Sequence, residues 1–564
     1  MGWADINIST KGKNDEDSYE SYVSSDVSQD QIEAGEGNDH TASLYDPKTG
    51  VKRALKDRHI SLLALGGVIG PGCLIGAGNA LAKGGPLALL LGFSIIGVIA
   101  FTVMESIGEI ITLYPSGGGF TTLARRFHSE SLSAVCGYAY IVVFFAVMAN
   151  EYNTLSSIFQ FWGPQVPLYG YILIFWAAFQ VFQMAGVGAF GEVEYWISWF
   201  KILGLIAYYI FSVIYMSGGV KNRPAFGFHY WNDPGALSHG FKGVAEVFVF
   251  CSTFYSGTES VAYSATESKN PNRAVPMAVK QTFWRILVVY VGIGFFYGVT
   301  VPFNDPNLNS DTKALKSPIS IAITRAGWEG GTHLINAFIL VTCISAINGS
   351  LFIGSRTITN LAHEGLAPKF LAWTDRRGVP IPAITLFNAL GLISLMNVSV
   401  GAASAYSYIV NLSGVGVFIV WGTIGLTHLR FRKAWTLQGR TVEELPYKAL
   451  FYPYTQICGI AANIFLALIQ GWTSFVPFNG GDFVDAYVLL PAAAVLYIGI
   501  AIFKNRSFRT IDLLTVDLDE GRREDLETIL EEEDEGESDK EHETNDKKFF
   551  KGKLYGKKVT KIFA

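Results

Sequence analysis

About twelve stretches of mostly apolar residues recur between residues 61 and 503, and most are long enough to matter, because a helix needs roughly 20 apolar residues to cross a bilayer. Of the 564 residues, 50% are hydrophobic and only 16% are charged, which exceeds what a soluble protein of this length hides in its cores. The sequence therefore predicts an all-α integral membrane protein. The predicted spans fall near 61–82, 86–112, 133–158, 168–186, 193–216, 243–265, 281–300, 333–353, 381–400, 405–427, 455–475 and 485–503.

Three regions follow from the charge pattern. Residues 1–55 are polar and predict a disordered cytosolic N-terminal tail, residues 56–505 a twelve-span transporter domain, and residues 506–564 a cytosolic C-terminal tail. About 14 basic residues lie in the loops assigned to the cytosol against about 7 outside, which agrees with both tails inside. Basic and aromatic residues alternate over 547–561, and this segment is either a solvated tail or a contact with anionic lipid.

Several function classes lack their signals. The charges are concentrated in tails and loops, so nucleic-acid binding is not indicated. The five cysteines have no CxxC spacing and no histidine partners that would suggest a metal site. No GxxxxGK[ST], HExxH or GxSxG motif occurs, which argues against direct ATP drive and against an enzyme, and we expect no bound cofactor.

Glycine and proline interrupt two of the predicted spans. Seven such residues lie between Gly66 and Gly78, and a straight helix is destabilised by each, so the chain should unwind near 69–72. The sixth span is interrupted at Ser256, Gly257 and Thr258. Paired breaks in corresponding halves indicate a transporter site near the bilayer midplane, while tight helix packing through small residues is the alternative.

Broken helices suit one class of substrate. One half-helix begins with free N–H groups and the other ends with free carbonyls, which is complementary to the carboxylate and ammonium of an amino acid. We therefore expect Ile69, Gly70 and Gly72, together with the break at 256–258, to hold the substrate backbone.

Five ionisable residues fall inside predicted spans. Each costs about 2.5–3.5 kcal/mol at the bilayer centre, so each should face a cavity or a partner. Glu259 directly follows the second break and is a candidate for substrate proximity or gating. Lys201 either supplies a fixed or titrating positive charge or extends toward the cytosolic interface. The five are Glu105, Glu109, Glu151, Lys201 and Glu259.

Several motifs, in order, resemble the fungal amino acid permeases within the amino acid, polyamine and organocation carriers. The resemblance covers about residues 50–515 and is most similar to the low-affinity general amino acid permeases of yeasts. The motifs include Leu55-Lys56-Asp57-Arg58-His59, Gly108-Glu109, Gly191-Glu192-Val193-Glu194-Tyr195-Trp196, Gly257-Thr258-Glu259, Glu267-Ser268-Lys269-Asn270-Pro271, Ser345-Ala346-Ile347-Asn348, Ser355-Arg356 and His428-Leu429-Arg430-Phe431-Arg432.

The resemblance implies a five-plus-five inverted-repeat, LeuT-like core with broken helices 1 and 6 and two extra helices. It implies proton-coupled uptake of amino acids across the plasma membrane, and control through ubiquitin-ligase machinery at the cytosolic tails. By resemblance Ser345 and Ala346 border the side-chain pocket. We further hypothesise that Glu151 and Glu259 assist ammonium recognition or gating and that Lys201 takes part in the proton step. An internal membrane, an amino acid sensor with little net transport, and a carrier of a related organic cation are the alternatives.

The first break departs from the family pattern. The family has Gly-Thr-Gly or Gly-Ser-Gly there, whereas this chain has Gly70-Pro71-Gly72. Proline has no N–H and no hydroxyl, so one donor to the substrate carboxylate is expected to be lost, although proline suits the first position of a restarting helix. We expect weaker or looser substrate binding.

Overall fold

The structure is a computed structural model that describes residues 52–66, 69–115, 119–221, 223–268, 271–309, 317–328, 330–398, 413–475, 477–504 and 508–522. These residues are largely helical, with two isolated bridges and no named strand among them, so the all-α prediction is confirmed. The elements are α3 (Asp57–Gly66), η2 (Gly72–Gly76), α4 (Ala77–Gly84), α5 (Pro86–Leu113), α6 (Gly119–Phe127), α7 (Glu130–Trp162), α8 (Leu168–Gln183), α9 (Val187–Met216), α10 (His229–Asn232), α11 (Gly240–Tyr255), η3 (Thr258–Ser260), α12 (Val261–Thr266), α13 (Pro271–Arg285), η4 (Ile286–Val291), α14 (Gly292–Thr300), η5 (Pro306–Asn309), α15 (Pro318–Arg325), α16 (Gly331–His363), η6 (Lys369–Ala372), α17 (Ile381–Leu390), η7 (Gly391–Val398), α19 (Ser413–Leu437), η8 (Val442–Glu444), α20 (Tyr454–Ile469), η9 (Trp472–Ser474), α21 (Gly480–Tyr487) and α22 (Leu489–Phe503).

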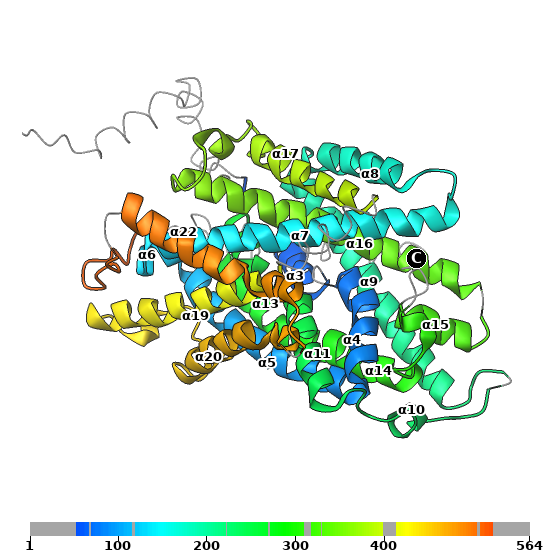
Figure 1. Cartoon of the computed structure of the whole chain (residues 1–564). Helices are drawn as coiled ribbons and strands as arrows, with labels where there is room; N and C mark the ends of the chain where they lie inside the picture. Colours follow the sequence, from blue (N-terminus) through cyan, green and yellow to red (C-terminus); the bar gives the residue numbers. More distant parts are fainter. Residues whose placement is uncertain are drawn as a thin grey trace, which may run out of the picture.

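The helices form a bundle whose longest members run along a common direction (Figure 1). Helix α7 packs against α16 and α19, and α11 packs against α5. Helices α8 and α17 lie along one flank and α20 along the opposite flank, while the short α6 and α15 lie at opposite ends (Figure 1). The axes of the long helices are thus roughly parallel, as expected for helices that span a bilayer.

Most of the predicted spans correspond to helices that are long and apolar enough to cross a membrane. Within the described ranges, seven helical segments are long and apolar enough to cross a membrane, and the α21–α22 pair, bent by 44°, makes an eighth. The first and sixth predicted spans are each divided by a break, and α8 and α20 are shorter apolar helices. Where the structure describes them, the twelve predicted runs lie largely on helices; residues 67–68 and 399–412 lie outside the described residues.

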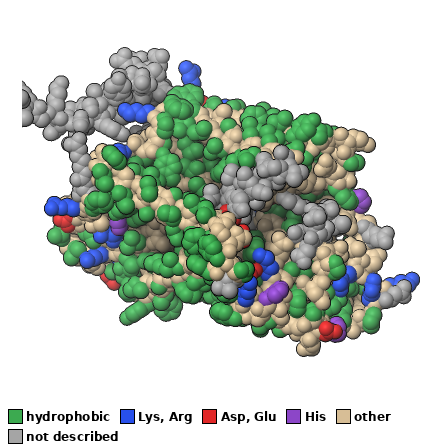
Figure 2. All heavy atoms as spheres, viewed as in Figure 1, with side chains coloured by type: hydrophobic (Ala, Val, Ile, Leu, Met, Phe, Trp, Pro, Cys, Tyr) green, Lys and Arg blue, Asp and Glu red, His purple; other side chains and the backbone are tan. Residues whose placement is uncertain are grey.

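The flank of the bundle is apolar. Hydrophobic side chains cover most of the visible flank, while lysine and arginine gather mostly toward the two ends (Figure 2). Trp196, Val181 and Phe465 expose more than half of their surface on three different helices. An apolar belt this large is unusual for a soluble monomer but is the surface that a lipid environment requires.

The helix ends follow local chemistry. Pro86 opens α5 directly after Gly85, whose φ of 86° lies in the left-handed region that glycine adopts without strain. Ser129 caps α7, because its hydroxyl accepts the N–H of Leu132 at 3.2 Å. These two caps fix where two of the longest helices begin.

Residues 508–522, which we name the C-terminal strap, lie against one end of the bundle. The strap is held mainly through its backbone carbonyls, and the side chains of Leu513, Val516 and Leu518 are buried beneath it. The sequence predicted this stretch only as part of a cytosolic tail. The donors to its carbonyls are Arg126 to Asp517 and Glu520, Arg430 to Ile511, Tyr114 to Leu518, and Gln438 to Leu513 and Val516.

His128, beneath the strap, should make stability depend on pH. Burial, reinforced by Arg430, lowers the pKa of His128 from 6.5 to about 4. A folded pKa below the unfolded value means that stability is fully present above about pH 6.5 and is lost as pH falls toward 4. The full shift corresponds to about 3 kcal/mol, which solvent screening of the half-buried ring reduces to roughly 2 kcal/mol. We expect the melting temperature of detergent-solubilised His128→Asn to depend less on pH over this range than that of wild type. An unchanged pH slope would contradict this, and the exposed His229 provides the control substitution, His229→Asn.

Candidate substrate site between two broken helices

The first break lies where the glycines predicted it. Helix α3 ends at Gly66, Ile69 and Gly70 are non-helical, and the helix resumes with η2 at Gly72. Pro71 directly precedes η2 with φ −62° and ψ −21°, angles that suit a helix start. The broken span is confirmed, with Gly72 inside the restarted half rather than in the unwound part.

The second break is confirmed at 256–258. Helix α11 ends at Tyr255, and Gly257 takes φ 94° and ψ −7°, a left-handed conformation that favours glycine. The Thr258 hydroxyl donates to the Tyr255 carbonyl at 2.5 Å, which closes the end of the first half-helix. The chain then restarts through η3 into α12.

The first broken span adjoins α16 at its break and the end of α11 at its restarted half. A Cβ built on Gly70 would lie 3.7 Å from the Ala346 Cβ, so the unwound part of the first span adjoins α16. A Cβ on Gly72 would lie 3.2 Å from Phe254 Cδ1, just before the second break. The glycines of this span were also open to a second interpretation, in which they allow tight helix packing. In the restarted half, Gly72 does pack closely, against Phe254.

One polar atom at the second break is left over. The Ser256 hydroxyl is buried and makes no hydrogen bond to any described residue. A buried hydroxyl normally has a partner, because an unsatisfied one costs about 1–3 kcal/mol. The Ser256 hydroxyl is thus able to make a hydrogen bond to a molecule bound at the second break.

Glu259 fastens the second break to α19. Its Oε1 accepts the Gly257 N–H at 3.0 Å, and its Oε2 accepts the Trp421 indole N–H at 3.0 Å. The carboxylate thus holds the left-handed glycine in place. Glu151, the other predicted acid, is 4% exposed on α7, which packs against both α16 and α19.

Lys201 belongs to a buried polar network. It is fully buried, which excludes extension to the interface, and its ammonium donates to Ser345 Oγ at 2.8 Å. Ser345 in turn donates to Glu194 Oε2 at 2.5 Å, and Asn348 Nδ2 donates to Glu194 Oε1 at 2.8 Å. Ser345 and Ala346 are consecutive on α16, and Ala346 adjoins Gly70. The network is therefore one residue away from the contact with the first break.

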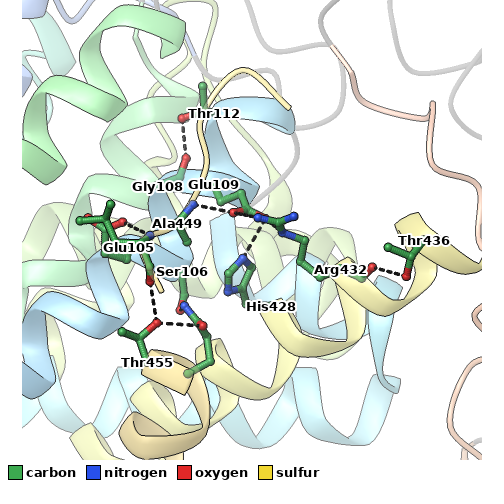
Figure 3. A network of polar contacts seen from close by, with 12 residues as sticks. Glu105, Ser106, Gly108, Glu109, Thr112, His428, Arg432, Thr436, Ala449 and Thr455 are labelled. Atoms are coloured by element: carbon green, nitrogen blue, oxygen red, sulfur yellow. Dashed lines mark hydrogen bonds and ion pairs between the residues drawn. The ribbon is translucent and has the colours of Figure 1, made fainter. Parts of the chain in front are cut away.

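A second buried network joins α5 to α19 and to the segment before α20 (Figure 3). Glu109 accepts hydrogen bonds from Arg432 and from the Ala449 N–H, and His428 Nε2 lies 3.0 Å from its Oε1. Glu105 accepts from the Tyr447 hydroxyl and from a backbone N–H, both at 2.9 Å. Both glutamates therefore have the partners that their position in a span requires.

Residues 59–513 match the amino acid permease family. The chain belongs to the amino acid permease family. It is 79% identical over 492 residues to the general amino acid permease AGP3 of Saccharomyces cerevisiae, covering 87% of this chain and 88% of that protein. An uncharacterized amino-acid permease of Schizosaccharomyces pombe is 46% identical over 90% of this chain and 92% of its own length. The basic amino-acid permease of S. cerevisiae is 35% identical, with 86% and 87% covered.

Several buried charges of this permease were not predicted as site residues. Glu194 stood in a motif that was quoted but was not singled out as a site. The ion pair between Arg356 Nε and Glu267 Oε1, at 2.8 Å, and the buried Arg285 were also passed over. Their position within or beside predicted spans was a usable signal, since a charge there needs a specific partner.

Restoring a hydroxyl at the first break of this permease should tighten substrate binding. Pro71 occupies the start of the restarted helix, where an N–H would otherwise point toward the break. We expect Pro71→Thr to lower the apparent KM for amino acid uptake several-fold, because the variant regains a donor for the carboxylate. Initial uptake rates over a concentration series would measure this. An apparent KM that is unchanged or higher would contradict it.

Proposed function

We propose that this permease takes up amino acids together with protons across the plasma membrane, with a broad range and low affinity. No bound cofactor is needed, because the proton gradient supplies the energy. The observation that carries the proposal is the position of the first broken span between α16 and the end of α11, with the Ser256 hydroxyl of the second break left free of described partners. The similarity to a relative named a general amino acid permease supports the broad range.

The chemistry of the breaks fits the part that all amino acids share. The N-terminal end of η2 carries positive dipole character and suits the substrate carboxylate, and the carbonyl end of α11 suits the ammonium group. Gly70, Gly72 and Gly257 keep the backbone bare where it would contact the substrate. Ser345 and Ala346 then border the variable side chain, where small residues leave room for many shapes.

The proton step is assigned to Lys201. A lysine buried in a protein interior changes its protonation readily, because burial disfavours the charged form. Lys201 reaches Ser345, whose neighbour Ala346 adjoins Gly70, so a change in its charge is felt at the first break. Protonation of Lys201 would thereby be linked to occupation of the substrate site.

The proposal also orients the protein. Both termini face the cytosol, so the end of the bundle that carries α6 and the C-terminal strap is the cytosolic end. Regulation through ubiquitin ligases at the tails would use lysines such as Lys11, Lys13 and Lys48, which lie outside the described residues.

An uptake panel tests the proposal. Labelled amino acids would be offered to cells that lack their own permeases, at acidic and neutral pH, with and without a protonophore. We expect accumulation that rises at acidic pH, collapses with the protonophore, and is lost in Lys201→Ala but kept in the control Lys83→Ala, whose lysine is half exposed at the end of α4.

Other outcomes favour the other readings. No uptake despite confirmed surface expression would favour a sensor or a carrier of an internal membrane. Uptake of polyamines or choline in preference to amino acids would favour an organic-cation carrier. Proton-driven accumulation that persists in Lys201→Ala would remove the role of that residue.

A further inference from the structure

We propose that Glu194 accepts the proton that Lys201 releases, passed through the hydroxyl of Ser345. This inference rests on the proposed proton coupling and adds a second titrating residue to it. It assigns a direction to the proton, from the substrate site toward the cytosolic end of α9.

The hydrogen bonds among Lys201, Ser345 and Glu194 have a defined donor at each step. A charged lysine has only donors, so Ser345 Oγ must accept from Lys201 Nζ, at 2.8 Å. The serine proton then points to Glu194 Oε2, at 2.5 Å. The three groups form an unbroken chain from a proton source to a carboxylate acceptor.

The transfer balances without any other reactant. An N–H bond of Lys201 breaks as its proton joins the Ser345 oxygen, and the original Ser345 O–H bond breaks as its proton joins Glu194. Serine ends as it began, lysine becomes a neutral amine, and the carboxylate becomes a carboxylic acid. Because Lys201 and Glu194 are 0% and 1% exposed, the transfer replaces two buried charges with two neutral groups.

The other oxygen of Glu194 is held still. Asn348 Nδ2 donates to Oε1 at 2.8 Å. The amide of Asn348 is itself oriented, since Gln183 Nε2 donates to Asn348 Oδ1 at 2.6 Å and to its carbonyl at 3.0 Å. Helices α8 and α16 together thus aim the free side of the Glu194 carboxylate at Ser345.

The spacing along α9 gives the direction. Glu194 precedes Lys201 by seven residues, which places both on one face, about 10 Å apart along the axis. Under the proposed orientation the beginning of α9 faces the cytosol. Glu194 therefore lies between Lys201 and the side where the proton must leave.

The surrounding helices offer no competing acceptor among the described contacts of Lys201 and Glu194. Helix α9 packs against α3, α14 and α16. From α3, His59 and Arg58 bond instead to Glu192, and from α14 Thr300 bonds Tyr208. Among the described residues of α16, Ser345 and Asn348 are the ones that donate to Glu194, and the Cys73 thiol of η2 interacts electrostatically with Lys201. The relay through Ser345 is the route that these contacts support.

The test uses the purified full chain in liposomes, with an inward proton gradient and a labelled amino acid identified by the uptake panel. We expect Glu194→Gln to lower gradient-driven accumulation at least tenfold and to flatten its pH profile, while exchange of internal for external substrate stays measurable. Glu192→Gln, two residues away on the same helix and 42% exposed at its side chain, is the matched control and should accumulate like wild type.

A second pair of variants covers the case in which Glu194→Gln does not fold. Ser345→Ala breaks the relay but keeps both charges, and should lower accumulation by a much larger factor than exchange, whereas Ser345→Thr keeps the hydroxyl and should restore accumulation. Full accumulation in Glu194→Gln or Ser345→Ala would overturn the relay, as would equal loss of exchange and accumulation. Failure of wild type to respond to the gradient would instead overturn the proposed proton coupling.

Discussion

Arg432→Leu should lower the free energy of unfolding by about 3–5 kcal/mol. Glu109 is fully buried and depends on Arg432, on the Ala449 N–H and on the nearby His428 for its charge (Figure 3). Removing the guanidinium leaves a buried carboxylate with too few partners. Removing one charge of a buried pair destabilises a protein more than removing both. Denaturant or thermal unfolding of the purified protein in lipid nanodiscs would measure the loss.

The neighbouring residue supplies a matched control. Lys433 is exposed, so Lys433→Leu should change stability by less than about 0.5 kcal/mol. The double variant Glu109→Leu/Arg432→Leu should recover part of the loss, because it removes both charges together. Equal stability of Arg432→Leu and wild type would show that the network does not hold α5 to α19.

Gly70→Leu should reduce uptake at least 100-fold without a matching loss of stability. The first Cβ atom would already lie 3.7 Å from Ala346, and the rest of a leucine side chain would fill the region between the first break and α16. Since that region is the proposed substrate site, the side chain would compete directly with the substrate. Initial uptake rates, normalised to the amount of protein at the cell surface, would measure the effect.

A glycine in open surroundings provides the comparison. A Cβ on Gly188, near the exposed start of α9, would meet no atom within 4 Å, so Gly188→Leu should transport like wild type. Wild-type uptake by Gly70→Leu would mean that the first break does not border the substrate. Equal loss in both variants would point to a general sensitivity of the helices rather than to a site.

Local signals in the sequence were enough to predict the framework. Runs of apolar residues define the spans, and the cluster of glycines after Gly66 is dense enough to predict a break without any knowledge of neighbours. The second break was also predicted locally, from Gly257 between Ser256 and Thr258. Both depend on a few adjacent residues, and this is the kind of information that one sequence contains.

The polar networks could not be predicted in the same way. Glu194 meets Ser345 across 151 positions and Glu109 meets Arg432 across 323, and no local pattern specifies which buried acid finds which partner. Lys201 could be read as interfacial for that reason, since its burial depends on α16. The C-terminal strap could not be predicted from its side chains, because its contacts use mainly backbone carbonyls, which every residue has.

The C-terminal strap also has a consequence for biosynthesis. Its carbonyls are bound by Tyr114, Arg126, Arg430 and Gln438, which lie at the ends of helices made early and late in translation. The strap can therefore dock only after α19 has been inserted beside α5 and α6, as the last described segment to leave the ribosome. A chain cut before residue 508 would leave those donors without these acceptors, so a docked strap shows that the described helices up to α22 have been made. Protein tags are accordingly best attached beyond Arg522.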